Sequence, residues 1–301
     1  MTATREISIA LPHLRMAAKV WGDPSLPALL AVHGWLDNAA SFDRLAPLLC
    51  QHFHIVALDL PGHGRSEHRP TGAWYHYVDY LGEVLAAADQ LGWRQFSLLG
   101  HSLGGTIASV LAAVCPERVG QLLLIEALGP LAGEAGHALT QLQRALDQRA
   151  ALQAKALRVF ASEAEAVQAR VKANGLSPEA ARILVSRGIR AASGGFVWSS
   201  DARLTLASPQ RYVEAQVLAL LEGIRAPTQL ILAQPAPSFL DEAMVNARIA
   251  RVPGIEVVRL PGHHHLHLED PQPVAAALLA FVAAGNSHQE HLDADYADQR
   301  G

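Results

Sequence analysis

Short, mostly apolar runs alternate along the chain with longer segments in which apolar positions recur at helical spacing. Six such runs are typical of parallel strands that are covered on both faces of a sheet. They are 28–34, 54–60, 96–100, 121–127, 228–233 and 255–260. Apolar residues at alternate positions in 7–11 and 14–20 predict an antiparallel hairpin before them. Because strand and helix then alternate, we expect an α/β fold with a mostly parallel, doubly wound sheet.

One interval, residues 129–227, breaks this alternation because it contains no convincing strand. It is rich in Ala, Gln, Arg and Glu, and several of its leucines recur near helical spacing. Ser177 and Pro178 supply a helix start, with the serine as the cap and the proline in the first turn. We therefore expect a helical cap that covers the carboxyl edge of the sheet. It is inserted after 121–127, the sixth strand when the two strands of the hairpin are counted.

The predicted organisation is one core domain, 1–128 and 228–285, interrupted by the cap at 129–227. A chain of 301 residues can bury roughly 75% of its unfolded surface, which is enough for one large domain with an insertion. The tail 286–301 is polar, and we expect it to be disordered.

Composition and charge narrow the class of partner. The net charge is −4 and the charged residues are spread along the chain, which argues against nucleic acid or an anionic membrane as a partner. The N-terminus lacks the pattern of a signal peptide, and no apolar stretch has the length of a membrane span. Cys50 and Cys115 are expected to be buried thiols in a reducing compartment, so the predicted location is the cytoplasm.

The segment 97–106, SLLGHSLGGT, places Ser102 in a G-x-S-x-G pattern between a strand and a helix. This is the context of a nucleophile elbow, in which a tight turn exposes the serine hydroxyl at the sheet edge. Gly100 and Gly104 fit this interpretation, because a Cβ would crowd so sharp a turn. The alternative is a serine that merely caps a helix.

A second strand end, His33-Gly34-Trp35, offers donors for an oxyanion hole. Gly34 lets the chain turn so that the N–H of Trp35 faces the same pocket as the N–H of Leu103. The alternative is a plain strand-to-loop turn with His33 as a hydrogen-bonded support.

A third strand end, Asp59 to Ser66, contains one proline and two glycines and predicts a tight loop. We expect Asp59 and Arg65 to pair and hold this loop rather than to take part in chemistry.

The last strand is followed by PGHHHLHLE, which contains four histidines between 263 and 267. One of them is expected to accept the proton of Ser102, since the base follows the serine and the acid in chain order. Contiguous residues do not converge easily on one ion and no suitably spaced cysteine or carboxylate is near, so we expect no metal and no cofactor. Spacing alone does not decide which histidine is the base.

The motifs HGWLDNAASFDRL, DLPGHGRS, GHSLGG, LLLIEALGP, WSSDARL and LPGHHHLHLEDP resemble the α/β-hydrolase superfamily over nearly the whole chain. More narrowly, they resemble its serine hydrolase-like branch. The resemblance implies an α/β-hydrolase fold with Ser102 as nucleophile. Counting back from Glu269 in the family pattern places the catalytic histidine at His264, with His265 as the nearest rival.

The acid departs from that pattern. Most relatives carry an aspartate just after the strand that corresponds to 228–233, but this chain has no carboxylate there before Asp241. Asp241 begins a helical segment, where a capping aspartate is ordinary. Some relatives carry the acid at the end of the strand after the nucleophile helix, where this chain has Glu126. A lone glutamate in so apolar a run needs a partner, so we favour Glu126.

The resulting hypothesis is a cofactor-free serine hydrolase that cleaves carboxylic esters with short to medium acyl chains through an acyl-enzyme. Ser102 is the nucleophile, His264 the base and Glu126 the acid, and a small-molecule ester is the partner. Two alternatives remain open. One is a non-catalytic ligand-binding or signalling scaffold. The other is a hydrolase that cleaves a different acyl bond or a C–C bond with the same triad.

Overall fold

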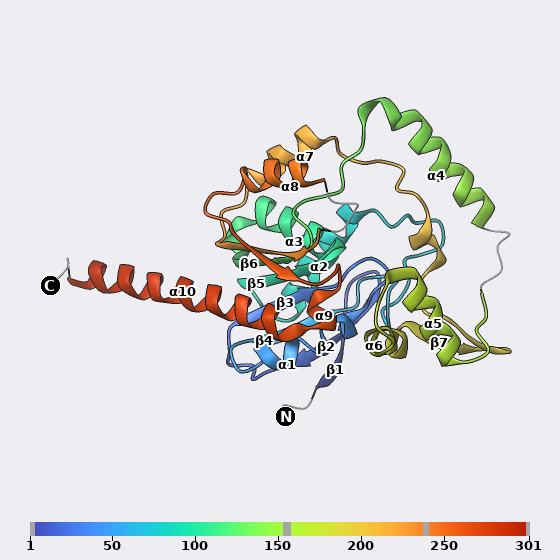
Figure 1. Ribbon diagram of the computed structural model, residues 1–301, viewed down its shortest axis with the longest axis horizontal. Coiled ribbons are helices and arrows are strands. Elements are labelled where there is room, and N and C mark those ends of the chain that lie inside the picture. Colours follow the sequence, from blue (N-terminus) through green and yellow to red (C-terminus); the bar gives the residue numbers. More distant parts are fainter. Residues whose placement is uncertain (1–3, 153–157, 237–240, 299–301) are drawn as a thin grey trace.

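An eight-stranded sheet lies at the centre of the molecule (Figure 1). The computed structural model describes residues 4–152, 158–236 and 241–298. The strands are arranged in the order β1-β2-β4-β3-β5-β6-β9-β10. Their bounds are β1 Arg5–Ala10, β2 Arg15–Trp21, β3 Ala28–Val32, β4 His54–Leu58, β5 Phe96–His101, β6 Val119–Ile125, β9 Thr228–Gln234 and β10 Glu256–Pro261.

Strand directions agree with the pattern of the sequence. The pairs β1–β2 and β2–β4 are antiparallel, and every other neighbouring pair in this sheet is parallel. The predicted hairpin and the predicted mostly parallel, doubly wound sheet are both confirmed. In such sheets ligands bind beyond the carboxyl ends of the strands, which here lie along one edge.

Alternate residues of the central strands enter two apolar cores on opposite faces of the sheet. In β3, Leu30 and Val32 belong to one core, whereas Leu29 and Ala31 belong to the other. Burial on both faces explains why these strands read as continuous apolar runs. The first core is covered by α2 Tyr77–Gln90, α3 Leu103–Val114, α7 Glu214–Leu221 and α8 Glu242–Ile249, and the second by α1 Ala46–Leu49 and α10 Pro271–Asp298.

The inserted segment, residues 129–227, is not purely helical as expected. Besides helices it contains a two-stranded hairpin formed by β7 and β8. Each strand has four residues, too few for alternation to stand out. Ser193 and Gly194 form the turn, and Gly194 adopts a φ of 85° that favours glycine. The elements are η3 Ala135–His137, α4 Ala138–Leu152, α5 Glu163–Asn174, α6 Pro178–Gly188, β7 Ile189–Ala192, β8 Gly195–Trp198, η4 Ala202–Thr205 and α7.

Local signals place α6 as predicted. The Ser177 hydroxyl accepts a hydrogen bond from the N–H of Ala180, and Pro178 occupies the first turn. Around α5 and α6, Phe160, Leu184 and neighbouring apolar residues form a third core that also includes Leu268 of α9, Leu266–Glu269. Figure 1 shows α4 lying apart from α5 and α6. The insertion is therefore attached to the rest of the molecule through α5 and α6 at the third core and through α7 at the first core.

The C-terminal tail departs from expectation because α10 continues from Pro271 to Asp298. Residues 286–298, predicted to be disordered, extend this helix away from the body of the molecule in Figure 1. The segment contains no proline that would end the helix.

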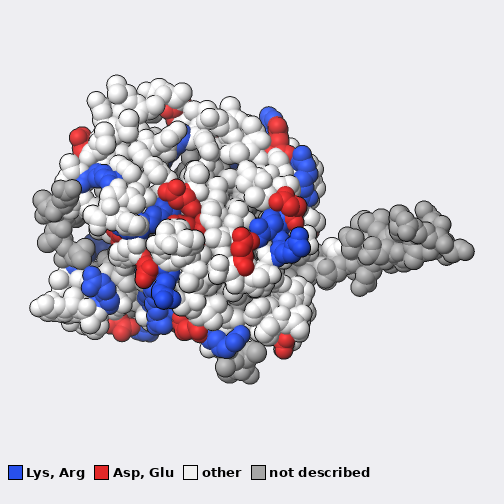
Figure 2. Space-filling model, turned by 180° about the vertical axis from the view of Figure 1, so that it is seen from behind, with Lys and Arg blue, Asp and Glu red and all other residues white. Residues whose placement is uncertain are grey.

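On the face seen in Figure 2, acidic and basic side chains lie close together and do not form separate acidic and basic patches.

Within the described residues, no helix combines the length and apolar character needed to cross a bilayer. Cys50 is buried and Cys115 half-buried, and neither forms a disulfide.

Candidate active site

Ser102 occupies the sharp turn between β5 and α3. A Cβ on Gly100 would lie 2.5 Å from the Gly104 carbonyl oxygen, and one on Gly104 would lie 1.9 Å from that of Val32. Both distances are too short for any side chain, so this turn requires glycine at both positions. The strand–turn–helix arrangement predicted around Ser102 is therefore present.

Backbone strain is concentrated at three strand ends. In the described part of the chain, only Leu36, Ser102 and Glu126 have a positive φ without being glycine, with values of 60°, 52° and 60°. They follow β3, β5 and β6, which are neighbours in the sheet. Such conformations cost roughly 1–3 kcal/mol each and cluster at functional sites, because the surrounding structure has to hold them.

His264 and Glu126 form a contact pair. The Nδ1 atom of His264 lies 3.1 Å from Oε2 of Glu126. The Glu126 side chain is fully buried, whereas 24% of the His264 side chain is exposed. The other carboxylate oxygen, Oε1, accepts the N–H of Ala233 at 2.5 Å. A carboxylate held in this way can fix the tautomer and the orientation of the imidazole ring.

Ser102 lies beside this pair along the sheet edge. The register of β5 and β6 pairs His101 with Ile125, the residues directly before Ser102 and Glu126. The N–H of Ser102 donates to the Ile125 carbonyl oxygen at 3.0 Å. The residue before Ser102 also contacts the loop that carries the predicted base: Nε2 of His101 donates to the carbonyl oxygen of His264 at 2.8 Å. The backbones at Ser102, Glu126 and His264 are therefore linked by hydrogen bonds of neighbouring residues at one edge of the sheet.

The rival residues lie in other environments. Asp241 is exposed and caps α8 by accepting the N–H of Met244 at 3.0 Å, as expected for a capping aspartate. His265 is buried, and its Nε2 lies 3.1 Å from Oδ2 of Asp37. The carboxylate in contact with His264 is therefore Glu126.

Trp35 and Leu103 come from adjacent strand ends. Val32 of β3 pairs with Gly100 of β5, so the loops that follow start side by side. Leu103 is the first residue of α3, and N–H groups in the first turn of a helix lack an intrahelical acceptor. The Trp35 ring is half-exposed, and its Nε1 donates to the carbonyl oxygen of Leu204 in the insertion at 2.9 Å.

His33 is a hydrogen-bonded support for the turn that contains Trp35. Its Nδ1 donates to the Gly34 carbonyl oxygen at 2.7 Å, and its Nε2 accepts the N–H of Leu60 at 3.0 Å. Burial lowers the pKa of His33 to about 4, so the ring is neutral near pH 7.

Sequence reasoning missed a buried group centred on Asp37. Its Oδ1 pairs with the guanidinium of Arg170 from α5, and its Oδ2 contacts His265 and lies 3.6 Å from Nδ1 of His101. Burial raises the pKa of Asp37, but His265 and Arg170 outweigh this effect and hold that pKa well below its ordinary value. The signal that could have found this group is a pair of polar residues, Asp37 and His101, beside motifs already assigned to the site.

Asp37, His101 and His265 each place one ligand-type atom within 4.8 Å of the others. His265 thus lies close to two residues that are distant in sequence. The expectation of no metal rests on the contiguous histidines and their near neighbours in sequence alone. A divalent cation here would, however, lie beside the Arg170 guanidinium in a buried site. This donor set therefore suits a hydrogen-bonded network better than a metal ion.

The expected side-chain pair of Asp59 and Arg65 is absent, and that prediction is wrong. The Asp59 carboxylate instead contacts Nε of Arg187 from α6 at 2.9 and 3.0 Å. Arg65 contributes only its backbone N–H, at 2.8 Å, while its guanidinium lies 3.3 Å from Glu6. A buried carboxylate gains more from a buried cation of the insertion than from a half-exposed one in its own loop.

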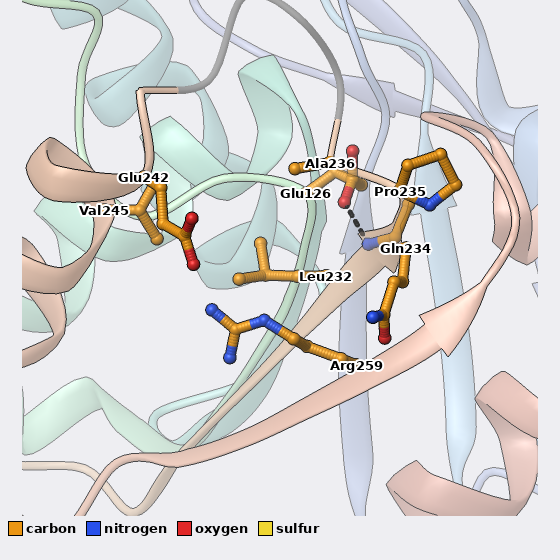
Figure 3. Close-up of a pocket in the computed structure, with 9 residues that line it drawn as sticks. Glu126, Leu232, Gln234, Pro235, Ala236, Glu242, Val245 and Arg259 are labelled. Carbon is orange, nitrogen blue, oxygen red and sulfur yellow. Dashed lines mark hydrogen bonds between the residues drawn. The ribbon is translucent and has the colours of Figure 1, made fainter.

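A cavity of about 440 Å³ lies beside Glu126, which is one of its lining residues (Figure 3). The dashed line in Figure 3 marks the hydrogen bond to Ala233. The cavity is lined by Glu126, Leu232, Ala233, Gln234, Pro235, Ala236, Glu242, Val245 and Arg259. Ser102 and His264 are not among these residues.

A doubly wound sheet with a serine elbow, and with a histidine paired to a buried carboxylate at its carboxyl edge, defines the class of α/β hydrolases. The family model for the alpha/beta hydrolase fold matches residues 27–271, and the chain belongs to this family. The fold inferred from the sequence resemblance is thereby confirmed, and family membership identifies the protein as a hydrolase.

Within the family, the chain lies in the serine hydrolase-like branch. It is 33% identical to serine hydrolase-like protein 2 of Homo sapiens over 92% of this chain and 93% of the relative. Among solved structures it is similar to a hypothetical protein from Pseudomonas aeruginosa PAO1, with 45% identity, a TM-score of 0.88, and coverage of 92% of this chain and 99% of the other. It is also similar to the thioesterase domain from the curacin biosynthetic pathway, with 28% identity, a TM-score of 0.81 and the same coverages.

Proposed function

We propose that this hydrolase cleaves carboxylic esters with short to medium acyl chains through an acyl-enzyme. Ser102 attacks the acyl carbon, His264 acts as base and then as acid, and Glu126 orients His264. The observation that carries the proposal is the buried Glu126 carboxylate 3.1 Å from Nδ1 of His264, at the edge where Ser102 directly precedes α3. Backbone strain at Ser102 and Glu126 supports it further.

Proton transfer follows from the orientation of the imidazole. With Nδ1–H donated to Glu126, Nε2 is the atom that takes the Ser102 proton as the hydroxyl attacks. The negative carboxylate stabilises the imidazolium that forms. Nε2 then returns the proton to the leaving alcohol, and a water molecule deacylates the serine by the same steps in the second half-reaction.

The developing oxyanion is held by the N–H groups of Trp35 and Leu103. The neutral His33 supports the first donor from behind, and the start of α3 supplies the second. The insertion, residues 129–227, acts as a cap over this edge and the core consists of 1–128 and 228–285. The contacts of Trp35 with Leu204 and of Asp37 with Arg170 support this division.

A second candidate substrate class is acyl thioesters. The likeness to the curacin thioesterase domain favours it, and the same triad cleaves both bonds. The two classes differ only in the leaving group, so a comparison of matched p-nitrophenyl esters and acyl thioesters separates them.

The test is turnover of p-nitrophenyl esters of graded chain length by the wild type and the Ser102→Ala variant. We expect the variant to lose roughly 10⁶-fold in kcat while the exposed control Ser186→Ala retains it. A fluorophosphonate probe is expected to label the wild type at Ser102. Unchanged turnover in Ser102→Ala would overturn the assignment, and absence of labelling and turnover in the wild type would favour the non-catalytic scaffold.

A further inference from the structure

The carboxylate of Asp37 joins four segments that are far apart in the sequence. Asp37 lies in the turn after β3, and its backbone N–H donates to the Gly34 carbonyl oxygen at 3.1 Å. One oxygen pairs with Arg170 of the insertion. The other lies 3.1 Å from His265 and 3.6 Å from His101. These residues adjoin the proposed oxyanion donor, base and nucleophile.

The backbone that follows the His264 side chain is held by this group at two points. The His264 carbonyl oxygen accepts a hydrogen bond from Nε2 of His101 at 2.8 Å. The next residue, His265, is tied to Asp37. The rings of His101 and His264 are also in contact, with centroids 4.8 Å apart. The position of the His264 backbone is therefore determined by groups that meet at Asp37.

The hydrogen bonds define the tautomer of His101. A carbonyl oxygen can only accept, so Nε2 of His101 carries the proton. Burial lowers the pKa of His101 to about 4, so the ring is neutral near pH 7 and Nδ1 has only a lone pair. Nδ1 is buried and has no hydrogen-bond partner among the described residues, although it faces Asp37. The Asp37 carboxylate is held in this place by Arg170 and His265.

We propose that Asp37 is a positioning residue that sets the place of His264 relative to Ser102, acting through His101 and His265. This inference rests on the proposed function. Arg170 neutralises the buried carboxylate, so Asp37 acts on the base by geometry rather than by its charge. A shift of about 1 Å between reacting groups costs on the order of 10²-fold in rate, which gives the scale of the expected effect.

A second buried ion pair provides a matched control. Arg187 of α6 joins the insertion to Asp59 after β4 at 2.9 Å, with side chains 3% and 0% exposed. The two pairs share residue types, burial and the connection between insertion and core. The hydrogen bonds of Arg187 lead to Asp59 and Glu6, and not to His101 or His265. Replacing Arg187 therefore tests loss of a buried ion pair without loss of the Asp37 group.

The experiment compares Asp37→Asn, the double variant Asp37→Asn/Arg170→Gln, and Arg187→Gln. Asp37→Asn leaves Arg170 as a buried unpaired cation, so we expect lower thermal stability and a shift of the acidic limb of kcat/KM to lower pH. The double variant removes both charges, so its stability and pH profile return towards the wild type. We expect its kcat to remain roughly 10- to 100-fold low with an unchanged KM.

Arg187→Gln is expected to lose thermal stability and to keep the wild-type kcat. Recovery of kcat in the double variant, together with stability, would overturn the positioning role. The same conclusion follows if Arg187→Gln lowers kcat as much as Asp37→Asn does.

A spectroscopic readout separates this inference from the proposed function. The Nδ1–H proton of His264, observed by NMR, is expected to shift or broaden in the double variant and to stay unchanged in Arg187→Gln. If the wild type shows no Ser102-dependent turnover or labelling but this shift occurs, the proposed function fails and the positioning survives. If turnover is normal and the signal does not move, the positioning fails alone.

Discussion

Two adjacent histidines each face a buried carboxylate at 3.1 Å, yet their surroundings differ. His264 contacts Glu126 and its side chain is 24% exposed, whereas His265 contacts Asp37 and is 5% exposed. The second oxygen of Glu126 is held by a backbone N–H, and that of Asp37 by the guanidinium of Arg170. A histidine–carboxylate distance alone therefore does not identify a catalytic pair. Access to the imidazole, and the group that balances the carboxylate, separate the proposed reacting pair from the supporting pair.

The strongest test of this comparison replaces each histidine in turn. His264→Ala removes the proposed base, and we expect kcat to fall by roughly 10⁶-fold. His265→Gln leaves the base in place, and we expect kcat to fall by about 10-fold or less. Steady-state kinetics with a p-nitrophenyl ester measures both values. A loss in His265→Gln that exceeds the loss in His264→Ala would exchange the roles of the two histidines.

The carboxylates give the next largest effect. Glu126→Gln keeps the shape of the side chain but no longer fixes the tautomer of His264, so we expect a loss of roughly 10⁴-fold in kcat. Asp241→Asn is the control, since Asp241 caps α8 at the surface. It should leave kcat within about twofold of the wild type, as distant surface changes usually do. If Asp241→Asn instead carried the large loss, Glu126 would not be the acid.

For the two buried carboxylates, stability should respond in the opposite order to kcat: the change at Asp37 should cost more free energy of unfolding than the change at Glu126. Asp37→Asn leaves the buried Arg170 unpaired, and we expect the free energy of unfolding to fall by about 3 kcal/mol. Glu126→Gln retains an oxygen for the Ala233 N–H, so we expect a change of about 1 kcal/mol or less. Denaturant unfolding measures both. Equal losses in the two variants would remove the distinction between a supporting and a reacting carboxylate.

The smallest predicted effect concerns His101, which lies between the two pairs. Its pKa is lowered to about 4 in the folded chain by burial, against an ordinary value of 6.5. Between these values the unfolded chain binds a proton that the folded chain does not, so acidification favours unfolding. The stability contribution of His101 is therefore present above pH 6.5 and is lost as the pH falls towards 4.

His101→Gln keeps a donor for the His264 carbonyl oxygen but does not titrate. Between pH 7 and pH 4.5 we expect the wild type to lose about 2 kcal/mol more unfolding free energy than this variant. Denaturant titrations at both pH values measure the difference. Parallel losses in the two proteins would contradict a neutral, buried His101.

Much of the fold was accessible from the sequence because burial on both faces leaves a plain signature. The apolar run around Leu29 and Leu30 predicts a central strand, since one of these residues enters each core. The four-residue strands β7 and β8 left no comparable signal. The helix that continues to Asp298 was hidden by a polar composition that is typical of disorder.

The site divides in a similar way. Ser102 was found because its flanking glycines answer a local steric demand. Glu126 was favoured because an isolated carboxylate in an apolar strand needs a partner. Asp37 and Arg170 escaped because their contact spans 133 positions and no local pattern encodes it. Long-range pairing of buried charges is the part of such a site that a single sequence does not reveal.

The most direct measurement is the rate at which a p-nitrophenyl ester acylates Ser102, followed by mass spectrometry of the intact protein. The wild type, Glu126→Gln and Asp37→Asn/Arg170→Gln are compared side by side. If Glu126 belongs to the reacting pair and Asp37 to the supporting pair, the acylation rate falls roughly 10⁴-fold in Glu126→Gln and roughly 10- to 100-fold in Asp37→Asn/Arg170→Gln. Equal losses, or the reverse order, would contradict this assignment.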